Sequence, residues 1–343
     1  GHSLISRVLR VKDNINHLTR SNTRRQSRNN IHAHYDISNA FFELWLDPTM
    51  TYSAALYRRQ DESLESAQRN KLNALIDMAR IEESHHILEI GTGWGSFAIQ
   101  AASRMGCRVT TVTISEEQHA LARRRVREAG LDHLVDVQFC DYREIEGKFD
   151  RIISIEMIEA VGPRYFSTFF EQCDRLLAQD GLLVLQAITI PDHRYDAYRK
   201  GCDWIQKYIF PGGHLPSLGA LNSAMQHNTT FYVEHLSNIG LHYGRTLRDW
   251  RELFTYKRQE VLDLGFDETF IRQWFYYLNY CEAGFGTGAL NALHLVISRP
   301  QNATLINSPT NPRRCFDENA PFLNAISRPA ASTTSRRTAP SNC

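Results

Sequence analysis

The chain has 343 residues, of which 42% are hydrophobic and 22% are charged, and its formal net charge at pH 7 is +1. These values are ordinary for a soluble globular protein. No apolar run approaches the roughly 18 residues that a membrane-spanning helix needs, so we expect no such helix. The polar start of the chain does not resemble a secretory signal, and the seven cysteines form no CxxC pair. We therefore expect neither a metal site nor a disulfide scaffold, and a reducing compartment such as the cytoplasm.

The first 30 residues are strongly basic. They contain seven lysines and arginines against one acidic residue, Asp13, so their net charge is +6. Such a basic leader suits an anionic surface, either lipid headgroups or nucleic acid, and it equally suits a solvated segment without a partner.

Residues 31–82 are rich in aromatic side chains and have helical patterns, in "NAFFELWL" and again in "ESLESAQRNKLNALIDMARI". We interpret them as a helical cap segment that precedes the main domain.

Residues 83–190 alternate short apolar runs with helical patterns. The runs predict strands over 86–90, 108–114, 135–139, 149–155 and 182–190. Helices are predicted over 95–104, from "SEEQ" (115–118) to a stop at Gly130, and over 163–178. Ser115 and Gln118 have the spacing of a capping box. Strands that alternate with helices predict a parallel sheet that is covered on both faces and binds its ligand at the carboxyl ends of the strands.

Residues 191–300 mix helical patterns with aromatics and end in the apolar run "ALNALHLVI" (289–297). After Pro300 the sequence is rich in Asn, Pro, Ser, Thr and Ala and has no periodicity. We predict that the tail over 301–343 is disordered.

The stretch "EIGTGWGS" (89–96) places three glycines where the first strand turns into a helix, so that backbone N–H groups can approach a ligand. It is not followed by the acidic residue of a nicotinamide site, and the chain has no phosphate-loop GK[ST]. The compact form E-x-G-x-G-x-G is instead typical of S-adenosylmethionine methyltransferases. Asp141, at the end of the third predicted strand, can accept a hydrogen bond from an adenine amine, or it caps the following turn.

Several longer motifs follow one another in a fixed order. They are "AHYDISNAFFELWLDPTMTYSAALY" (33–57), "EIGTGWGSFA", "TISEEQ", "CDYRE" (140–144), "SIEMIEAVG" (154–162), "YIFPGGHLPS" (208–217) and "WFYYLNYCEAGF" (274–285). Together they resemble the cyclopropane fatty acid synthase family, which includes the mycolic acid cyclopropane synthases, over residues 30–298. The resemblance implies an α/β fold: a Rossmann-like class I S-adenosylmethionine-dependent methyltransferase sheet with a helical N-terminal cap and an inserted lid. The methyltransferase domain would span 83–300, with an acyl-pocket insertion over about 191–285.

The resemblance also implies methyl transfer from S-adenosylmethionine to the cis double bond of an acyl chain, usually within a membrane phospholipid. An alkene is a poor nucleophile, so the site must provide proximity to the methyl donor and a dry environment. The transfer leaves a carbocation that must lose a proton, and the proton acceptor decides whether a cyclopropane or a methyl-branched or methylene chain results.

Ten residues correspond to the cofactor contacts of the family. Their motifs come from the cap segment, the glycine loop and the ends of the second and third predicted strands. They are Tyr52, Ser53, Gly91, Gly93, Trp94, Thr113, Ile114, Gln118, Asp141 and Tyr142.

The resemblance further implies a bound bicarbonate as the proton acceptor, held by a Cys, a Glu, a His, a Tyr and a backbone position. Glu159, Tyr277 and Ile188 match the Glu, the Tyr and the backbone position, whereas Ala54 stands for the Cys and Gln186 for the His. Gln186 can still donate an N–H to an anion. We predict Glu159, Tyr277, Gln186 and Ile188 as catalytic residues, and the two departures bring ring closure and the bicarbonate into question. Glu159 could itself act as the base, and Glu156 is assigned no role.

The expected partners are unsaturated phospholipid acyl chains and an anionic membrane surface, not nucleic acid, with a homodimer left open. This predicts a cytoplasmic protein that associates peripherally with the membrane. Two alternatives remain: a small-molecule amine N-methyltransferase, since plant alkaloid enzymes share much of this scaffold, and a non-catalytic protein that binds S-adenosylmethionine at a membrane surface.

Overall fold

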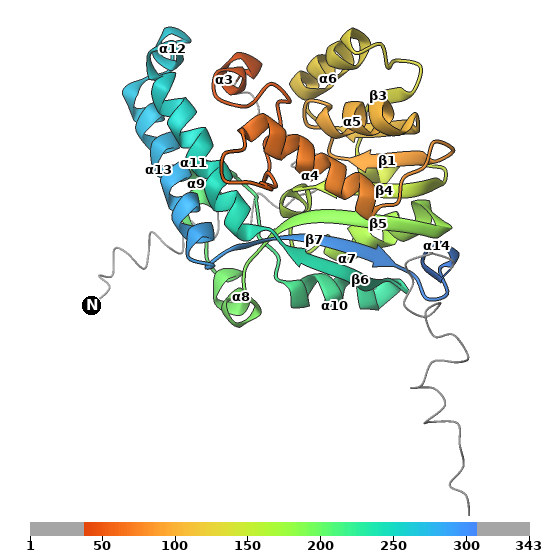
Figure 1. Cartoon of the computed structure of the whole chain (residues 1–343). Coiled ribbons are helices and arrows are strands. Elements are labelled where there is room, and N and C mark those ends of the chain that lie inside the picture. Colours follow the sequence, from red (N-terminus) through yellow and green to blue (C-terminus); the bar gives the residue numbers. More distant parts are fainter. Residues whose placement is uncertain (1–37, 307–343) are drawn as a thin grey trace, which may run out of the picture. The chain divides into compact units, whose positions relative to one another are not determined.

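The computed structural model describes residues 38–306 (Figure 1). Two units are distinguished: one ends at Pro300, and the other begins at Gln301 and is described only as far as the short helix α14 (Ala303–Ile306). The predicted basic leader and the rest of the predicted tail lie outside the described residues. None of the helices in the described part of the chain is long and apolar enough to cross a bilayer.

The first unit is built on a seven-stranded sheet with the order β3-β2-β1-β4-β5-β7-β6. The strands are β1 (His86–Ile90), β2 (Arg108–Thr113), β3 (Val135–Phe139), β4 (Phe149–Ile155), β5 (Leu177–Thr189), β6 (Tyr232–Asn238) and β7 (Asn291–Ser298). Strands β1 to β5 pair in parallel, as the sequence predicts. The predicted bounds of β1, β3 and β4 are confirmed, and β5 starts five residues earlier than predicted.

The sheet is mixed, which the alternation of strands and helices did not predict. Strand β7 runs antiparallel to β5 on one side and to β6 on the other. The apolar run 289–297 forms most of β7, which is buried along most of its length. Strand β6 is an edge strand with a largely exposed, polar sequence, so it has no periodic apolar signal. Its position in the sheet is therefore set by its pairing with β7, and its own sequence does not predict it.

Helices cover the sheet on both sides, as predicted (Figure 1). Helix α4 packs against α5, and α7 packs against α10 below the sheet in the figure. Within the described residues of this unit, the helices are α3 (Asn39–Glu43), α4 (Leu64–Met78), α5 (Ser96–Met105), α6 (Glu116–Glu128), α7 (Phe166–Leu176), α8 (Asp192–Tyr198), α9 (Trp204–Tyr208), α10 (Leu218–Asn228), α11 (Gly240–Tyr256), α12 (Arg258–Asp263), α13 (Glu268–Gly286) and the 3-10 turns η1 (Tyr142–Glu144) and η2 (Ile158–Ala160).

The predicted capping box of α6 forms only in half. The Ser115 hydroxyl accepts from the Gln118 N–H at 3.3 Å, as an N-cap should. The Gln118 side chain does not return this bond to Ser115; its Oε1 accepts from the Thr113 hydroxyl at 2.9 Å. The Ser115 N–H donates to Thr113 Oγ1 instead. Gln118 is thus turned toward the end of β2, where the candidate site lies.

Two apolar clusters form the core of this unit. One lies between the sheet and α7 and includes Phe169, Leu183 and Leu295. The other is aromatic and joins the cap segment to α11 and α13; Phe41, Trp45 and Trp250 in it are fully buried. Helices α11 and α13 pack along one another at the same end of the unit (Figure 1). Parts of the cap segment and of α11 and α13 therefore belong to the core of this unit.

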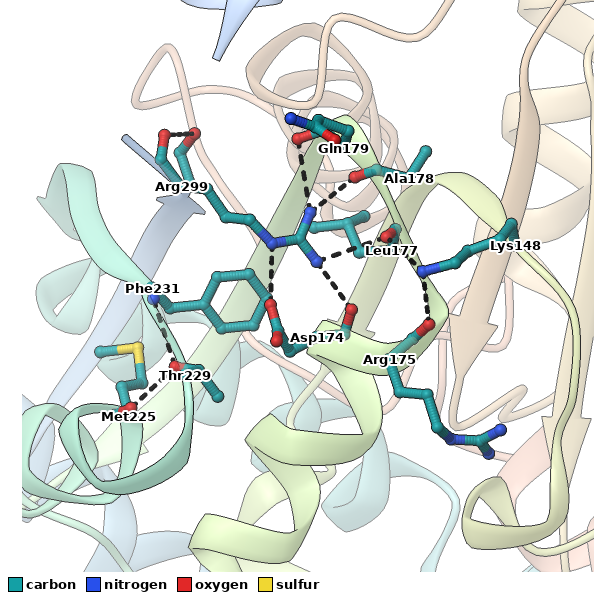
Figure 2. A network of polar contacts seen from close by, with 11 residues as sticks. Lys148, Asp174, Arg175, Leu177, Ala178, Gln179, Met225, Thr229, Phe231 and Arg299 are labelled. Atoms are coloured by element: carbon teal, nitrogen blue, oxygen red, sulfur yellow. Dashed lines mark hydrogen bonds and ion pairs between the residues drawn. The ribbon is translucent and has the colours of Figure 1, made fainter. Parts of the chain in front are cut away.

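A polar clamp joins the end of β7 to the junction of α7 and β5 (Figure 2). The Arg299 guanidinium donates to the Asp174 carboxylate at 2.8 Å and to the carbonyls of Asp174 and Ala178 at 2.6 and 2.7 Å. Lys148 donates to the Arg175 carbonyl at 2.7 Å. The last carbonyls of a helix have no partner within the helix, so these two cations satisfy the C-terminus of α7.

Candidate active site

One cavity lies at the carboxyl ends of the parallel strands. Its wall is formed by the ends of β1, β2 and β4 and by the residues that follow β3, and it is completed by segment 50–53 and by α4. The chain order reverses here, since β1 lies between β2 and β4. Open α/β sheets bind their ligands at this kind of reversal, so the sequence predicted the right edge of the sheet.

The glycine loop after β1 leaves space in the cavity wall. Gly91 has φ +100°, and a Cβ added to it would lie 3.2 Å from the Met157 side chain. Gly93 has φ +51°, and an added Cβ would meet no atom within 4 Å. Both backbone conformations disfavour other residues. At Gly93 the absent side chain leaves open space for a ligand.

All ten residues that the sequence predicted as cofactor contacts line this cavity. They come from three parts of the chain: the cap segment (Tyr52 and Ser53), the glycine loop (Gly91, Gly93 and Trp94) and the ends of β2 and β3 with the start of α6 (Thr113, Ile114, Gln118, Asp141 and Tyr142). The fold thus brings the set together. Their roles in binding stay predictions.

The cap segment closes over the glycine loop through α3. The Trp94 indole N–H donates to Asn39 Oδ1 at 2.8 Å, and the Asn39 amide N–H donates to Glu117 at 2.9 Å. The ring of Phe42 lies 5.0 Å from that of Trp94. A residue of α3 is therefore bonded to both the loop and the start of α6.

Asp141 is buried and is paired with its neighbour. Its two carboxylate oxygens accept from the Arg143 guanidinium at 2.9 and 2.6 Å, and one also accepts from the Arg143 N–H as the cap of η1. The prediction that Asp141 caps the following turn is therefore confirmed. Asp141 also lines the cavity, and its carboxylate oxygens keep acceptor capacity beyond these bonds.

The cavity wall also contains two buried charged groups that sequence reasoning missed. Lys71 is fully buried and donates to the Ser53 hydroxyl at 2.7 Å. Burial lowers the pKa of Lys71 to about 8, against the opposing pull of Glu156, Asp47 and Glu89. Burial raises the pKa of Glu89 to about 8, although the Thr111 hydroxyl and Lys71 favour its charged form.

A sequence signal existed for Lys71. The buried face of α4 runs through Leu64, Ala67, Gln68, Lys71, Leu72, Leu75 and Ile76, at helical spacing. Lys71 therefore occupies an apolar-stripe position, and a lysine in such a stripe indicates a buried partner for its charge.

The four predicted catalytic residues lie behind this cavity rather than on its wall. The Tyr277 hydroxyl bonds the Tyr52 hydroxyl at 2.9 Å, and Tyr52 does line the cavity. The Ile188 N–H donates to Glu159 Oε1 at 2.5 Å, while Glu159 Oε2 is buried without a hydrogen-bond partner. Burial, and then the charge of Glu156, raises the pKa of Glu159 to about 8.

Gln186 is hydrogen-bonded to Glu156. Its Nε2 donates to Glu156 Oε1 at 2.7 Å, and its Oε1 accepts from His294 Nε2 at 3.0 Å on the paired strand β7. Glu156 Oε1 also accepts from the Ala54 N–H at 2.9 Å, and Oε2 accepts from the Tyr243 hydroxyl at 2.7 Å. Glu156, to which the sequence analysis assigned no role, lines the cavity.

The residues do not fit the bicarbonate that the resemblance implies. The N–H groups of Gln186 and Ala54, which stand at two of the expected ligand positions, both donate to the Glu156 carboxylate. The Ile188 N–H already donates to Glu159 Oε1. A bound anion would have to compete with Glu159 for this donor and share the other two with the Glu156 carboxylate, which is unfavourable in a buried site.

The comparisons with known proteins point to one family. The family model described as mycolic acid cyclopropane synthetase matches residues 22–295. The chain belongs to the mycolic acid cyclopropane synthetase family. The match includes the whole cavity wall and all four predicted catalytic residues.

Relatives within this family cover most of the chain. Tuberculostearic acid methyltransferase UfaA1 of Mycobacterium tuberculosis is 44% identical over 81% of this chain and 66% of its own length. Cyclopropane-fatty-acyl-phospholipid synthase of Escherichia coli K12 is 38% identical over 78% of this chain and 66% of its own length. The chain thus spans about two thirds of these two proteins.

A solved member of the family shares the fold. The structure of mycolic acid cyclopropane synthase CmaA1 complexed with SAH and CTAB aligns with a TM-score of 0.74 and 27% sequence identity, over 79% of this chain and 98% of that one. This confirms the predicted Rossmann-like class I methyltransferase fold.

Proposed function

We propose that this mycolic acid cyclopropane synthetase family member transfers a methyl group from S-adenosylmethionine to the double bond of an unsaturated fatty acyl chain, held in a phospholipid. The product is a cyclopropane or a methyl-branched or methylene chain. The observation that carries the proposal is that one cavity at the strand reversal gathers all ten predicted cofactor contacts.

The residues present suit S-adenosylmethionine. The missing side chains at Gly91 and Gly93 leave room next to the backbone. Thr113, Gln118 and Asp141 offer polar groups toward the ribose and adenine, and Glu89 offers a carboxyl to a cationic ligand. When bound, S-adenosylmethionine supplies an electrophilic methyl group.

The acyl double bond is proposed to lie beyond Tyr52, toward Tyr277, Gln186, Ile188 and Glu159. Aromatic rings form this side: Phe210 stacks 6.4 Å from Tyr52 and lies 5.8 Å from Tyr277. Such rings exclude water and stabilise positive charge through their π faces. A cation that develops on the acyl chain is therefore favoured here.

Labelled S-adenosylmethionine tests the proposal. The purified protein is incubated with anionic phospholipid vesicles that carry either cis-unsaturated or saturated acyl chains. We expect label in the extracted lipid only with unsaturated chains, and a mass gain of one CH2 group. Fragmentation of the product then separates a ring from a branched chain.

Two results would contradict the proposal. Label found only in an added amine would indicate an N-methyltransferase. Saturable binding of S-adenosylmethionine without any product on lipid or amine would indicate a binding protein without catalysis.

A further inference from the structure

The Glu156 carboxylate accepts several hydrogen bonds at the wall of the cavity. Three donors from three separate parts of the chain converge on it: the Ala54 N–H at 2.9 Å, Gln186 Nε2 at 2.7 Å and the Tyr243 hydroxyl at 2.7 Å. Their separations in sequence from Glu156 are 102, 30 and 87 residues. Three hydrogen bonds to a carboxylate favour its charged form.

The backbone at Glu156 is held in an unusual conformation. Its φ is +48°, in the left-handed region that disfavours a side chain of this size. The Glu156 N–H donates to the Gln186 carbonyl at 2.8 Å, which fixes the turn at the end of β4. Strained residues of this kind are concentrated at functional sites. The turn places the carboxylate against the three donors, at a residue that lines the cavity.

Burial raises the pKa of Glu156 as it raises that of Glu159, but Lys71 and three hydrogen-bond donors favour the charged form of Glu156, whereas only two backbone N–H groups favour that of Glu159. The buried ammonium of Lys71 attracts Glu156 from α4, and the charge of Glu156 in turn opposes ionisation of Glu159. Tyr243 donates to it, and His294 is buried and neutral behind Gln186, because burial lowers the pKa of His294 to about 3. With a pKa of about 8, Glu159 is mostly protonated at neutral pH and cannot then accept a proton.

We propose that Glu156 is the built-in proton acceptor of the methyl transfer reaction and takes the place of a bound anion. This rests on the proposed function. The alkene π pair forms the new C–C bond to the methyl carbon, and the C–S pair stays on sulfur. The neighbouring acyl carbon is left as a cation. A C–H bond of the methylated chain then breaks, its electron pair neutralises the cation, and the proton moves to a Glu156 oxygen.

The first test compares isosteric variants. Glu156→Gln keeps the shape and one acceptor oxygen but removes the base; its NH2 group replaces the second oxygen, so one of the present donors must turn away or, as the Tyr243 hydroxyl can, accept instead. We expect its turnover of unsaturated phospholipid to fall about 100-fold or more, while its Kd for S-adenosylhomocysteine stays within about threefold of the wild-type value. Glu128→Gln, at the exposed end of α6, is the control for replacing a glutamate by a glutamine.

Glu159→Gln is the competing variant. Because Glu159 is protonated at neutral pH, a neutral amide there resembles its working state. We expect this variant to retain at least about tenfold more turnover than Glu156→Gln. The reverse order, with Glu156→Gln nearly as active as the wild type, would overturn the proposal.

The second test is chemical rescue, which a purely structural role would not allow. Glu156→Gly relieves the left-handed backbone and removes the carboxylate. We expect added formate or bicarbonate to restore part of the turnover of this variant. The wild type should be insensitive to bicarbonate in buffer freed of carbon dioxide. A wild type that requires added bicarbonate would contradict a built-in acceptor.

The results of these experiments distinguish the proposed function from the assignment of Glu156 as the proton acceptor. If the wild type methylates no lipid, the proposed function fails before any variant is measured. If it does and the Glu156 variants keep their turnover, only the assignment to Glu156 fails.

Discussion

At the scale of single residues, the cavity is defined by charged groups that are buried deeply enough to change their protonation. Lys71, Glu89 and Glu156 all line it, and burial is the largest cause of the pKa shift of each. An ionised group in such a place costs free energy unless partners compensate it. These residues therefore lower the stability of the protein at some pH values, which can be measured.

Glu89→Gln tests the protonation of the cavity wall. The pKa of Glu89 is raised from 4.5 to about 8, so the folded state holds the proton more tightly than the unfolded chain does. The contribution of Glu89 to stability is therefore complete below pH 4.5 and is lost as the pH rises to about 8. We expect the unfolding free energy of the variant, relative to the wild type, to rise over this range by up to about 4 kcal/mol.

Urea unfolding of both proteins at several pH values measures this difference. Below the ordinary pKa the carboxyl is protonated in both states, so the difference should become constant there and serves as an internal control. A difference that stays constant from pH 4.5 to 8 would mean that Glu89 is ionised in the folded protein.

At the scale of elements, the turns at the strand ends place the predicted contacts. The loop after β1 contains three glycines with positive φ, and each of the parallel strands β1, β2 and β4 ends at the cavity. The packing of α4 then brings Lys71 to the same place, because its buried face continues through that residue. The site thus depends on where elements end more than on any single helix.

Gly93→Ala tests the glycine loop against a matched position. Gly93 and Gly130 both have positive φ, +51° and +70°, and at both an added Cβ meets no atom within 4 Å. Only Gly93 lines the cavity. We expect both alanine variants to lose about 1 kcal/mol of stability. We expect only Gly93→Ala to bind S-adenosylhomocysteine at least about tenfold more weakly, because its methyl group enters the ligand space.

Calorimetric titration of the two variants gives both Kd values. Equal, unweakened binding would show that the loop does not contact the cofactor at Gly93.

At the scale of the whole first unit, the antiparallel strand β7 ties distant parts together. It pairs with β5 next to the cavity and with the edge strand β6, and its residue His294 supports Gln186. Beyond its end, Arg299 fastens it to α7 (Figure 2). The part of the chain that follows α13 therefore stabilises the parallel sheet that the sequence predicted.

Arg299→Met tests this clamp. The change removes the bonds to Asp174 and Ala178 and leaves carbonyls of the α7 terminus without donors. The Arg299 side chain is 17% exposed, so solvent screens the ion pair little. We expect a loss of about 2 kcal/mol and a Tm lower by about 5 °C. Arg299→Lys should retain part of this stability, since lysine donates hydrogen bonds but cannot reach several acceptors together.

Differential scanning calorimetry measures the change, and S-adenosylhomocysteine binding at 25 °C is the control. We expect the affinity to be unchanged, because the clamp lies away from the cavity. A variant as stable as the wild type would mean that water replaces the clamp at no cost.

The resemblance to a known family supplied the ten residues around the cavity, whereas the sequence pattern by itself determined β1 to β5, the helices between them and the glycine loop. These features depend on neighbouring residues: apolar periodicity, turn chemistry and motif spacing act within about one element. The same reasoning missed β6, which has too little apolar surface to be recognised away from its partner strand. It also did not predict that Lys71 and Glu156 line the cavity. Glu156 meets Ala54 and Tyr243 across 102 and 87 residues. Only the tertiary structure decided which carboxylate receives the three donors, because hydrogen bonds, burial and charge act through space rather than along the chain.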